Sequence, residues 1–93
     1  MNLELRRRIE AAAVALRAAG AREVYIFGSA AQDTLSEGSD IDLAVSGLPP
    51  ECFFPAMGRL HDILDQPLDL IDLDEVNLFT QYLKTRGKLQ RVA

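Results

Sequence analysis

Apolar residues recur along this 93-residue chain with two different periods, one typical of helices and one typical of strands. Near the N-terminus they follow the spacing of one helix face, at Leu5, Ile9, Ala12, Ala13 and Leu16. A second run has the same spacing, at Phe53, Met57, Leu60 and Leu64. Three shorter apolar runs, at residues 23–27, 40–45 and 68–73, lie between turn-forming residues and predict strands. This order of elements indicates an α/β (α+β) protein.

Turn and cap residues set the expected limits of these elements. Gly47 and the prolines that follow it break the second strand. Pro55 is compatible with the second helix only within its first turn. Asp74 is a suitable N-cap for a third helix that runs to Arg86. The chain is therefore expected to form a single domain over residues 1–93, with a small mixed β-sheet of three to four strands flanked by helices.

The charge of the chain is distributed unevenly. Residues 33–75 hold one Arg and eleven acids, a net charge of −10, whereas residues 1–32 carry +2 and residues 76–93 carry +4. An acidic middle makes a polynucleotide an unlikely partner and favours a cation site. No apolar run approaches the roughly 20 residues that span a bilayer, so no membrane association is expected. A single cysteine, Cys52, offers no disulfide framework and favours the reducing cytoplasm.

Two carboxylates in the second predicted strand supply the first candidate chemistry. Asp40 and Asp42 are separated by one residue, so their side chains lie on the same face of a strand. Ile41 and Leu43 then point the other way, into a core. Neighbouring carboxylates repel each other unless a cation lies between them, and oxygen-only ligands suit Mg²⁺. Asp69 lies inside the third apolar run, where a buried strand has no structural use for a lone charge, so it is either exposed on one face or the third ligand.

A turn of small residues, Gly28-Ser29, directly follows the first predicted strand. Glycine lets the backbone approach a ligand closely, and the N–H groups at the start of a helical segment form an anion site. A short helical segment and a polar loop at 33–39 are expected to follow the turn. Gly28 and Ser29 are therefore candidate phosphate-binding residues. A phosphate site beside a divalent-metal site is typical of phosphoryl or nucleotidyl transfer.

These residues resemble the pattern of the minimal nucleotidyltransferases of the DNA-polymerase-beta-like superfamily. That pattern is Gly-Ser, a spacer, Asp-x-Asp after a serine, and a later Asp on a neighbouring strand. The positions that match are Gly28, Ser29, Ser39, Asp40, Asp42 and Asp69. The likeness extends over nearly the whole chain. One departure follows the Gly-Ser, where family members often carry an Arg and this chain has Ala30, Ala31 and Gln32.

The resemblance implies a polymerase-beta-like nucleotidyltransferase fold and an enzyme that transfers AMP from ATP. By the same resemblance, Gly28 and Ser29 bind the nucleotide phosphates. Asp40, Asp42 and Asp69 hold Mg²⁺, two ions in all, and carry the catalysis.

The partner is also an expectation from the resemblance. Larger members of the superfamily carry an acceptor-binding domain, for which 93 residues leave no room, so the acceptor is expected to arrive with another protein in a homo- or hetero-oligomer. Minimal nucleotidyltransferases often act as antitoxins of HEPN-type helical ribonuclease toxins, by attaching AMP to a hydroxyl of the toxin. Two alternatives remain open. One is a non-catalytic antitoxin that acts by binding alone, and the other is transfer to a small molecule, such as an antibiotic, with a separate acceptor-binding subunit.

Overall fold

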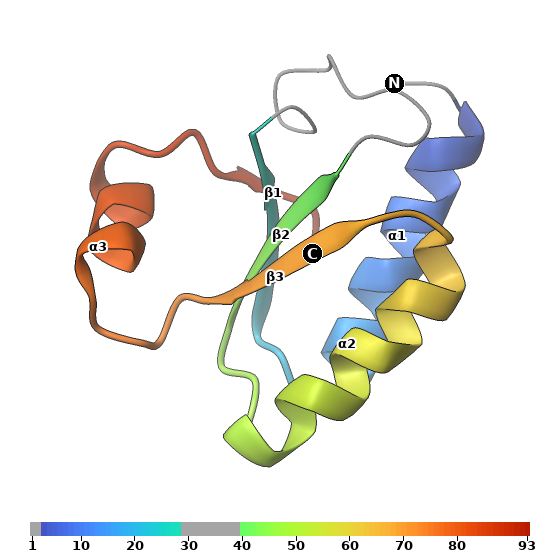
Figure 1. Cartoon of the computed structure of the whole chain (residues 1–93), viewed down its shortest axis with the longest axis horizontal. Coiled ribbons are helices and arrows are strands. Elements are labelled where there is room, and N and C mark those ends of the chain that lie inside the picture. Colours follow the sequence, from blue (N-terminus) through green and yellow to red (C-terminus); the bar gives the residue numbers. More distant parts are fainter. Residues whose placement is uncertain (1–2, 29–39) are drawn as a thin grey trace.

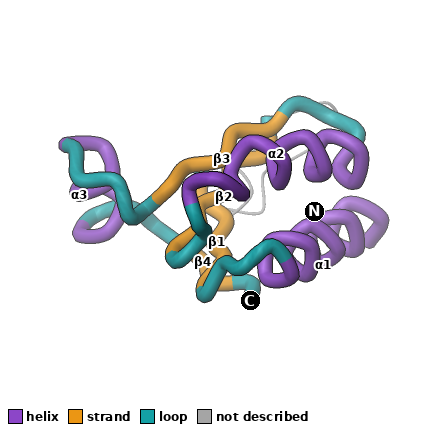
Figure 2. Tube along the Cα trace, turned by 90° about the horizontal axis from the view of Figure 1, so that it is seen from below, coloured by secondary structure: helices purple, strands orange, loops and turns teal. Residues whose placement is uncertain are grey.

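The computed structural model describes residues 3–28 and 40–93. Within them the helices are α1 (Leu3–Ala18), α2 (Pro50–Leu64) and α3 (Leu78–Thr85), and the strands are β1 (Glu23–Phe27), β2 (Ile41–Ser46), β3 (Leu68–Asp72) and β4 (Gln90–Arg91). The strands form one sheet, with α1 and α2 on one side and α3 on the other (Figures 1 and 2). No helix in this part of the chain is both long enough and apolar enough to cross a membrane.

The sheet is mixed, as the sequence predicts, and its strand order is β3-β2-β1-β4. Strand β1 is antiparallel to both β2 and β4. Strands β2 and β3 are parallel because helix α2 carries the chain back across the sheet between them. Strand β3 is therefore an edge strand, and its outer side is not paired within the sheet.

Side chains alternate along the strands and divide the sheet into two unequal faces. One face packs against α1 and α2 in the main core, whose largest fully buried members are Leu5, Leu16, Val24, Ile41, Leu43, Val45, Leu60 and Leu64. The opposite face carries a smaller buried cluster of Ala44, Leu73 and Leu83, the last of which comes from α3. Because α3 is short, it covers this second face only in part (Figure 1). Among the described residues, part of this face of the sheet is therefore uncovered.

The start of the third helix differs from the predicted one. Helix α3 begins after Asn77, not after Asp74. The Asn77 side chain accepts a hydrogen bond from the Thr80 N–H at 2.9 Å, and the Thr80 hydroxyl accepts one from the Asn77 N–H at 3.2 Å. This reciprocal capping box satisfies two N–H groups at once. Asp74 is engaged elsewhere, since its carboxylate accepts a hydrogen bond from the Gly47 N–H at 2.7 Å and ties two loops together.

The start of the second helix also differs. Helix α2 begins at Pro50, where the fixed φ of proline suits a first helical position. Pro55 consequently lies beyond the first turn, inside the helix, and the expectation that it belongs to the first turn is wrong. The apolar spacing from Phe53 onward does not indicate the extra turn because that turn is largely exposed.

Candidate active site

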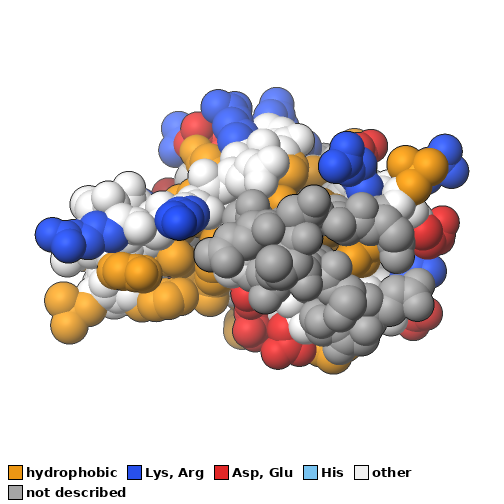
Figure 3. Space-filling view, turned by 90° about the horizontal axis from the view of Figure 1, so that it is seen from above, with side chains coloured by type: hydrophobic (Ala, Val, Ile, Leu, Met, Phe, Trp, Pro, Cys, Tyr) orange, Lys and Arg blue, Asp and Glu red, His pale blue; other side chains and the backbone are white. Residues whose placement is uncertain are grey.

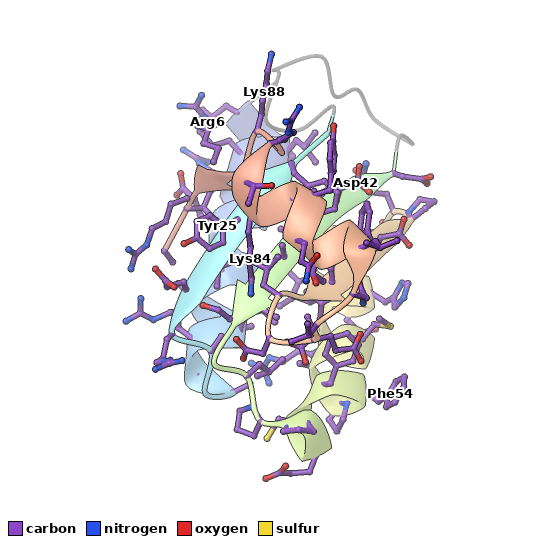
Figure 4. The ribbon with its side chains drawn as sticks, turned by 90° about the vertical axis from the view of Figure 1, so that its left-hand side faces the viewer. Arg6, Tyr25, Asp42, Phe54, Lys84 and Lys88 are labelled. Carbon is purple, nitrogen blue, oxygen red and sulfur yellow. The ribbon has the colours of Figure 1, made fainter. Side chains whose placement is uncertain are left out.

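The parallel pairing of β2 and β3 brings two of the predicted carboxylates together. Asp42 and Asp69 are direct partners across this strand pair. Asp42 alternates with Ile41 and Leu43, which are buried on the face that packs against α1 and α2. The side chains of Asp42 and its partner Asp69 therefore project from the opposite face of the sheet, the one that α3 partly covers. Figure 4 shows Asp42 near the end of the sheet at which β2 begins. Adjacent strands lie about 4.8 Å apart, which places the two carboxylates side by side.

Gly28 lies against the carboxylate of Asp42, on the β1 side of β2, whereas Asp69 lies on the β3 side. Gly28 follows β1 directly and has a φ of +64°, in the left-handed region that favours glycine. A Cβ atom at this position would lie only 2.5 Å from Oδ2 of Asp42. The turn therefore passes so close to the carboxylate that a larger residue would force the Asp42 side chain to shift. This steric reason adds to the close approach to phosphate that the sequence suggests for Gly28.

The surroundings of Asp42 shift its protonation. Partial burial raises the pKa of the Asp42 carboxyl, and the negative charges of Asp69 and then Asp40 raise that pKa further. Asp40 and Asp69 are themselves exposed. Asp42 is therefore the carboxylate of this site whose charge is most disfavoured, and a nearby cation would favour its charged form.

The remaining acids and polar residues of the predicted pattern have different positions. Asp40 lies one residue before β2 and is therefore not part of the strand. Its negative charge nevertheless raises the pKa of Asp42. Ser29 and Ser39, and with them the predicted helical segment and polar loop, lie outside the described residues. Asp72 takes no part in the site, in agreement with its strand parity, and its Oδ1 accepts a hydrogen bond from the Asp74 N–H at 2.9 Å.

The acids of this site have the ligand chemistry of a divalent-metal site. Asp40, Asp42 and Asp69 offer carboxylate oxygens alone, which are the ligands that Mg²⁺ prefers. Within residues 3–28 and 40–93, no three His, Cys, Asp or Glu side chains are close enough to hold a metal ion as they stand. The Asp42–Asp69 pair nevertheless fits a cation in charge and chemistry, because a cation would relieve the repulsion that raises the Asp42 pKa. These residues could therefore hold Mg²⁺.

One neighbour of the site is not identified from the sequence. The Phe79 ring of α3 packs edge to face on Phe27, with 6.4 Å between ring centroids and 63° between ring planes. Phe27 is in turn the partner of Asp42 across β1 and β2. An aromatic contact thus anchors α3 beside the carboxylates. The apolar spacing within α3 indicates a helix face but contains no information about which strand that face meets.

This fold and site define a nucleotidyltransferase-type domain, with a mixed sheet, a glycine turn after its first strand and paired carboxylates on the next two. Residues 14–89 match the family model described as Polymerase beta, Nucleotidyltransferase. The chain belongs to this family. No match was found among the curated proteins.

Solved structures give the same assignment. A protein described as a minimal nucleotidyltransferase is similar with a TM-score of 0.74 and 26% sequence identity, over 94% of both chains. A toxin–antitoxin structure with AMP-PNP is 31% identical, with a TM-score of 0.67, over 86% of this chain and 70% of its own. The toxin–antitoxin MntA-HepT is 26% identical, with a TM-score of 0.64, over 90% and 69%. The chain thus resembles minimal nucleotidyltransferases of toxin–antitoxin pairs.

Proposed function

We propose that the protein is a metal-dependent nucleotidyltransferase that transfers AMP from ATP to a hydroxyl of a partner protein, as the antitoxin of a HEPN-type toxin. The observation that carries this proposal is the direct pairing of Asp42 with Asp69 beside the Gly28 turn. In a polymerase-beta-like nucleotidyltransferase domain, this is the arrangement that a nucleoside triphosphate and a divalent ion require.

In this proposal each group of the chain has a defined task. Asp40, Asp42 and Asp69 hold Mg²⁺, which when bound neutralises the triphosphate and makes an acceptor hydroxyl more acidic. The Gly28 backbone and the Ser29 hydroxyl bind the phosphates and orient the nucleotide. The acceptor oxygen then bonds to the α-phosphorus, the bond from that phosphorus to the β-phosphate oxygen breaks, and pyrophosphate leaves. The acceptor proton passes to solvent, because the charged groups that act on Asp42 among the described residues are the acids Asp69 and Asp40.

Lys88 is our candidate for the positive charge that a triphosphate needs. Strand β4 pairs with β1 so that Gln90 lies opposite Ile26. Lys88 lies two residues before Gln90, so it precedes β4 at the end of the sheet at which Gly28 follows β1. Figure 4 shows Lys88 extending beyond the same end of the molecule at which Asp42 lies.

A pair of lysine variants tests this assignment. Lys88→Ala should raise the KM for ATP about tenfold, the loss of one charge-assisted contact to phosphate. Lys84→Ala removes the same charge from α3, farther from that end of the sheet, and serves as the control (Figure 4). Equal KM values for the two variants would remove Lys88 from the site.

The partner is supported by the similar structures, two of which are toxin–antitoxin structures. The decisive experiment co-expresses the protein with the protein encoded beside it and measures the intact mass of that neighbour. Wild type and the surface variant Asp62→Asn should both add the mass of one adenylyl group (AMP less water), whereas Asp42→Asn should add nothing. If Asp42→Asn still neutralises a toxic neighbour and no mass is gained with wild type, the protein is an antitoxin that acts by binding alone.

A further inference from the structure

An apolar surface lies beside the acid cluster and has no partner within the described residues. Five large hydrophobic side chains are exposed in this region. Leu78, Phe79 and Tyr82 lie on α3, Val76 lies just before it, and Phe54 lies near the start of α2. Their exposed fractions include 86% for Leu78, 84% for Val76 and 77% for Phe54. Figure 3 shows apolar side chains gathered over α3, next to acidic ones, and Figure 4 shows Phe54 pointing away from the rest of the molecule. Contiguous exposed apolar surface of this kind marks an interaction site.

A groove of about 540 Å³ runs through this surface, between α2, the edge strand β3 and α3. Phe53, Phe54, Leu70, Ile71 and Phe79 supply its apolar lining. Asp72 and Glu75 supply its charge, and no Lys or Arg is among the described residues that line it. We call this groove, together with Val76, Leu78 and Tyr82, the α3 surface.

The groove leads toward the carboxylates. Ile71 lies two residues after Asp69 on the same strand face, a distance of about 7 Å along β3. Phe79 forms part of the groove wall and packs on Phe27, the cross-strand partner of Asp42. A molecule bound in the groove would therefore reach the acid cluster if it extended about 7 Å past Ile71 along β3.

The extent of the α3 surface indicates a polypeptide rather than a nucleotide base. A base could fill the groove, but Val76, Leu78 and Tyr82 do not line it and would remain exposed. Only an occupant that continues past the groove and over α3 covers these three side chains. Protein segments bind in this way, with apolar anchors in a groove and further contacts around them.

Charge argues against a second copy of the chain as the occupant. In a symmetric dimer the same patch meets itself, so Asp72 and Glu75 of one copy would face the acids of the other. Like charges brought together in this way oppose association. A complementary occupant instead carries Lys or Arg beside its apolar residues.

We propose that the α3 surface binds an apolar segment of another protein that carries Lys or Arg beside its apolar residues. This segment brings the acceptor hydroxyl to Asp42 and Asp69, so the inference rests on the proposed transfer function and adds where and how the acceptor binds. Binding itself does not need catalysis. It should therefore persist in Asp42→Asn, which separates failure of the docking surface from failure of the enzyme.

The test uses two synthetic amphipathic helical peptides of about 15 residues, one of Leu and Lys and one of Leu and Glu, since peptides of this length can fold on a groove. Binding is measured by fluorescence anisotropy, and the bound surface is mapped by amide chemical shifts of the labelled protein. The Leu/Lys peptide should bind wild type and Asp42→Asn equally and shift residues of α3, β3 and the start of α2. The Leu/Glu peptide should bind at least about tenfold more weakly.

Matched variants separate the α3 surface from general stickiness. Leu78→Asp should weaken the Leu/Lys peptide by about tenfold, as expected for an exposed apolar anchor. Val14→Asp makes the same kind of change at a 68% exposed position on α1 and should leave binding unchanged. Equal weakening by both variants, or shifts confined to the acid cluster, overturns the proposal. Concentration-dependent dimerisation of wild type that Leu78→Asp abolishes also overturns it, because the occupant is then a second copy.

Discussion

Replacing Asp42 by asparagine should stabilise the folded domain while abolishing metal-supported activity. Asparagine has nearly the same shape as aspartate but no charge, so the change removes the repulsion from Asp69 and Asp40 and leaves the packing intact. The pKa of Asp42 is raised by partial burial and by these two charges, which means that folding costs free energy while Asp42 is ionised. The variant should therefore have a larger free energy of unfolding than wild type at neutral pH.

The size of the effect follows from the strand geometry. Asp42 and Asp69 are direct partners on strands about 5 Å apart, for which Coulomb's law gives roughly 0.8 kcal/mol in bulk water and about 3 kcal/mol at an effective dielectric constant of about 20. Asp69 is exposed and solvent screens the pair, so the lower value applies. A gain of about 1 kcal/mol raises the Tm of a domain of this size by about 4 to 8 °C.

The pH dependence gives the sign of the effect a second test. Since the folded-state pKa of Asp42 is raised, the cost of its charge is fully present at neutral pH. It is relieved as the pH falls through the raised pKa toward the ordinary range of aspartate. The advantage of Asp42→Asn should therefore shrink on acidification and vanish where the carboxyl is protonated in both folded and unfolded states.

Thermal unfolding followed by circular dichroism measures both effects, with Asp62→Asn as the control for net charge. Asp62 is exposed on α2, so its loss should change the Tm little. Adding Mg²⁺ should raise the Tm of wild type and not that of Asp42→Asn. The Tm of wild type should then equal or exceed that of the variant. A Tm of Asp42→Asn at or below that of wild type without metal, at neutral pH, would refute the electrostatic account of this site.

Three further changes test other parts of the structure. Gly28→Ala should lower the free energy of unfolding by about 1 to 2 kcal/mol in urea titrations, since the new Cβ meets Asp42 and the backbone has a positive φ; an unchanged midpoint would contradict the close approach. Asn77→Ala should cost about 1 kcal/mol through loss of the cap and speed hydrogen exchange in α3 first; uniform acceleration across the domain would argue against a local role. Ser46→Ala should raise the pKa of Glu23, which a hydrogen bond of 2.9 Å from the serine hydroxyl lowers, in a carbon-13 titration; a pKa that stays low would assign the shift to other neighbours.

Periodicity along the chain predicts the elements well because burial on one side of each element is a local property of the sequence. Ile9, Leu16 and Leu60 are buried where their helical spacing places them. The strand parity of Asp42 also follows from the alternation with Ile41 and is confirmed. These inferences need only the geometry of a single helix or strand.

Pairings between elements are harder to obtain, since they depend on contacts distant in sequence. Nothing in the spacing of Asp42 and Asp69 indicates that the two residues are direct partners, because a shift of one residue in strand register would separate them. The start of α3 is missed for a related reason. Asp74 and Asn77 are both good caps, and the choice between them depends on a hydrogen bond from Gly47, which lies 27 residues away.

The features that cost this domain stability lie beside its candidate active site. A 93-residue domain buries a limited core, and here one sheet face is only partly covered by an eight-residue helix. On that face the chain places like charges in adjacent strands, passes the Gly28 turn close to one of them and leaves apolar side chains of the α3 surface exposed. The paired charges and the exposed apolar side chains each cost stability in the isolated chain, and the proposed ligands, a cation between the carboxylates and a protein segment over the α3 surface, would offset these costs. Because anything that binds the folded state stabilises it, cation and partner should each raise the Tm, and a variant that loses one response should keep the other.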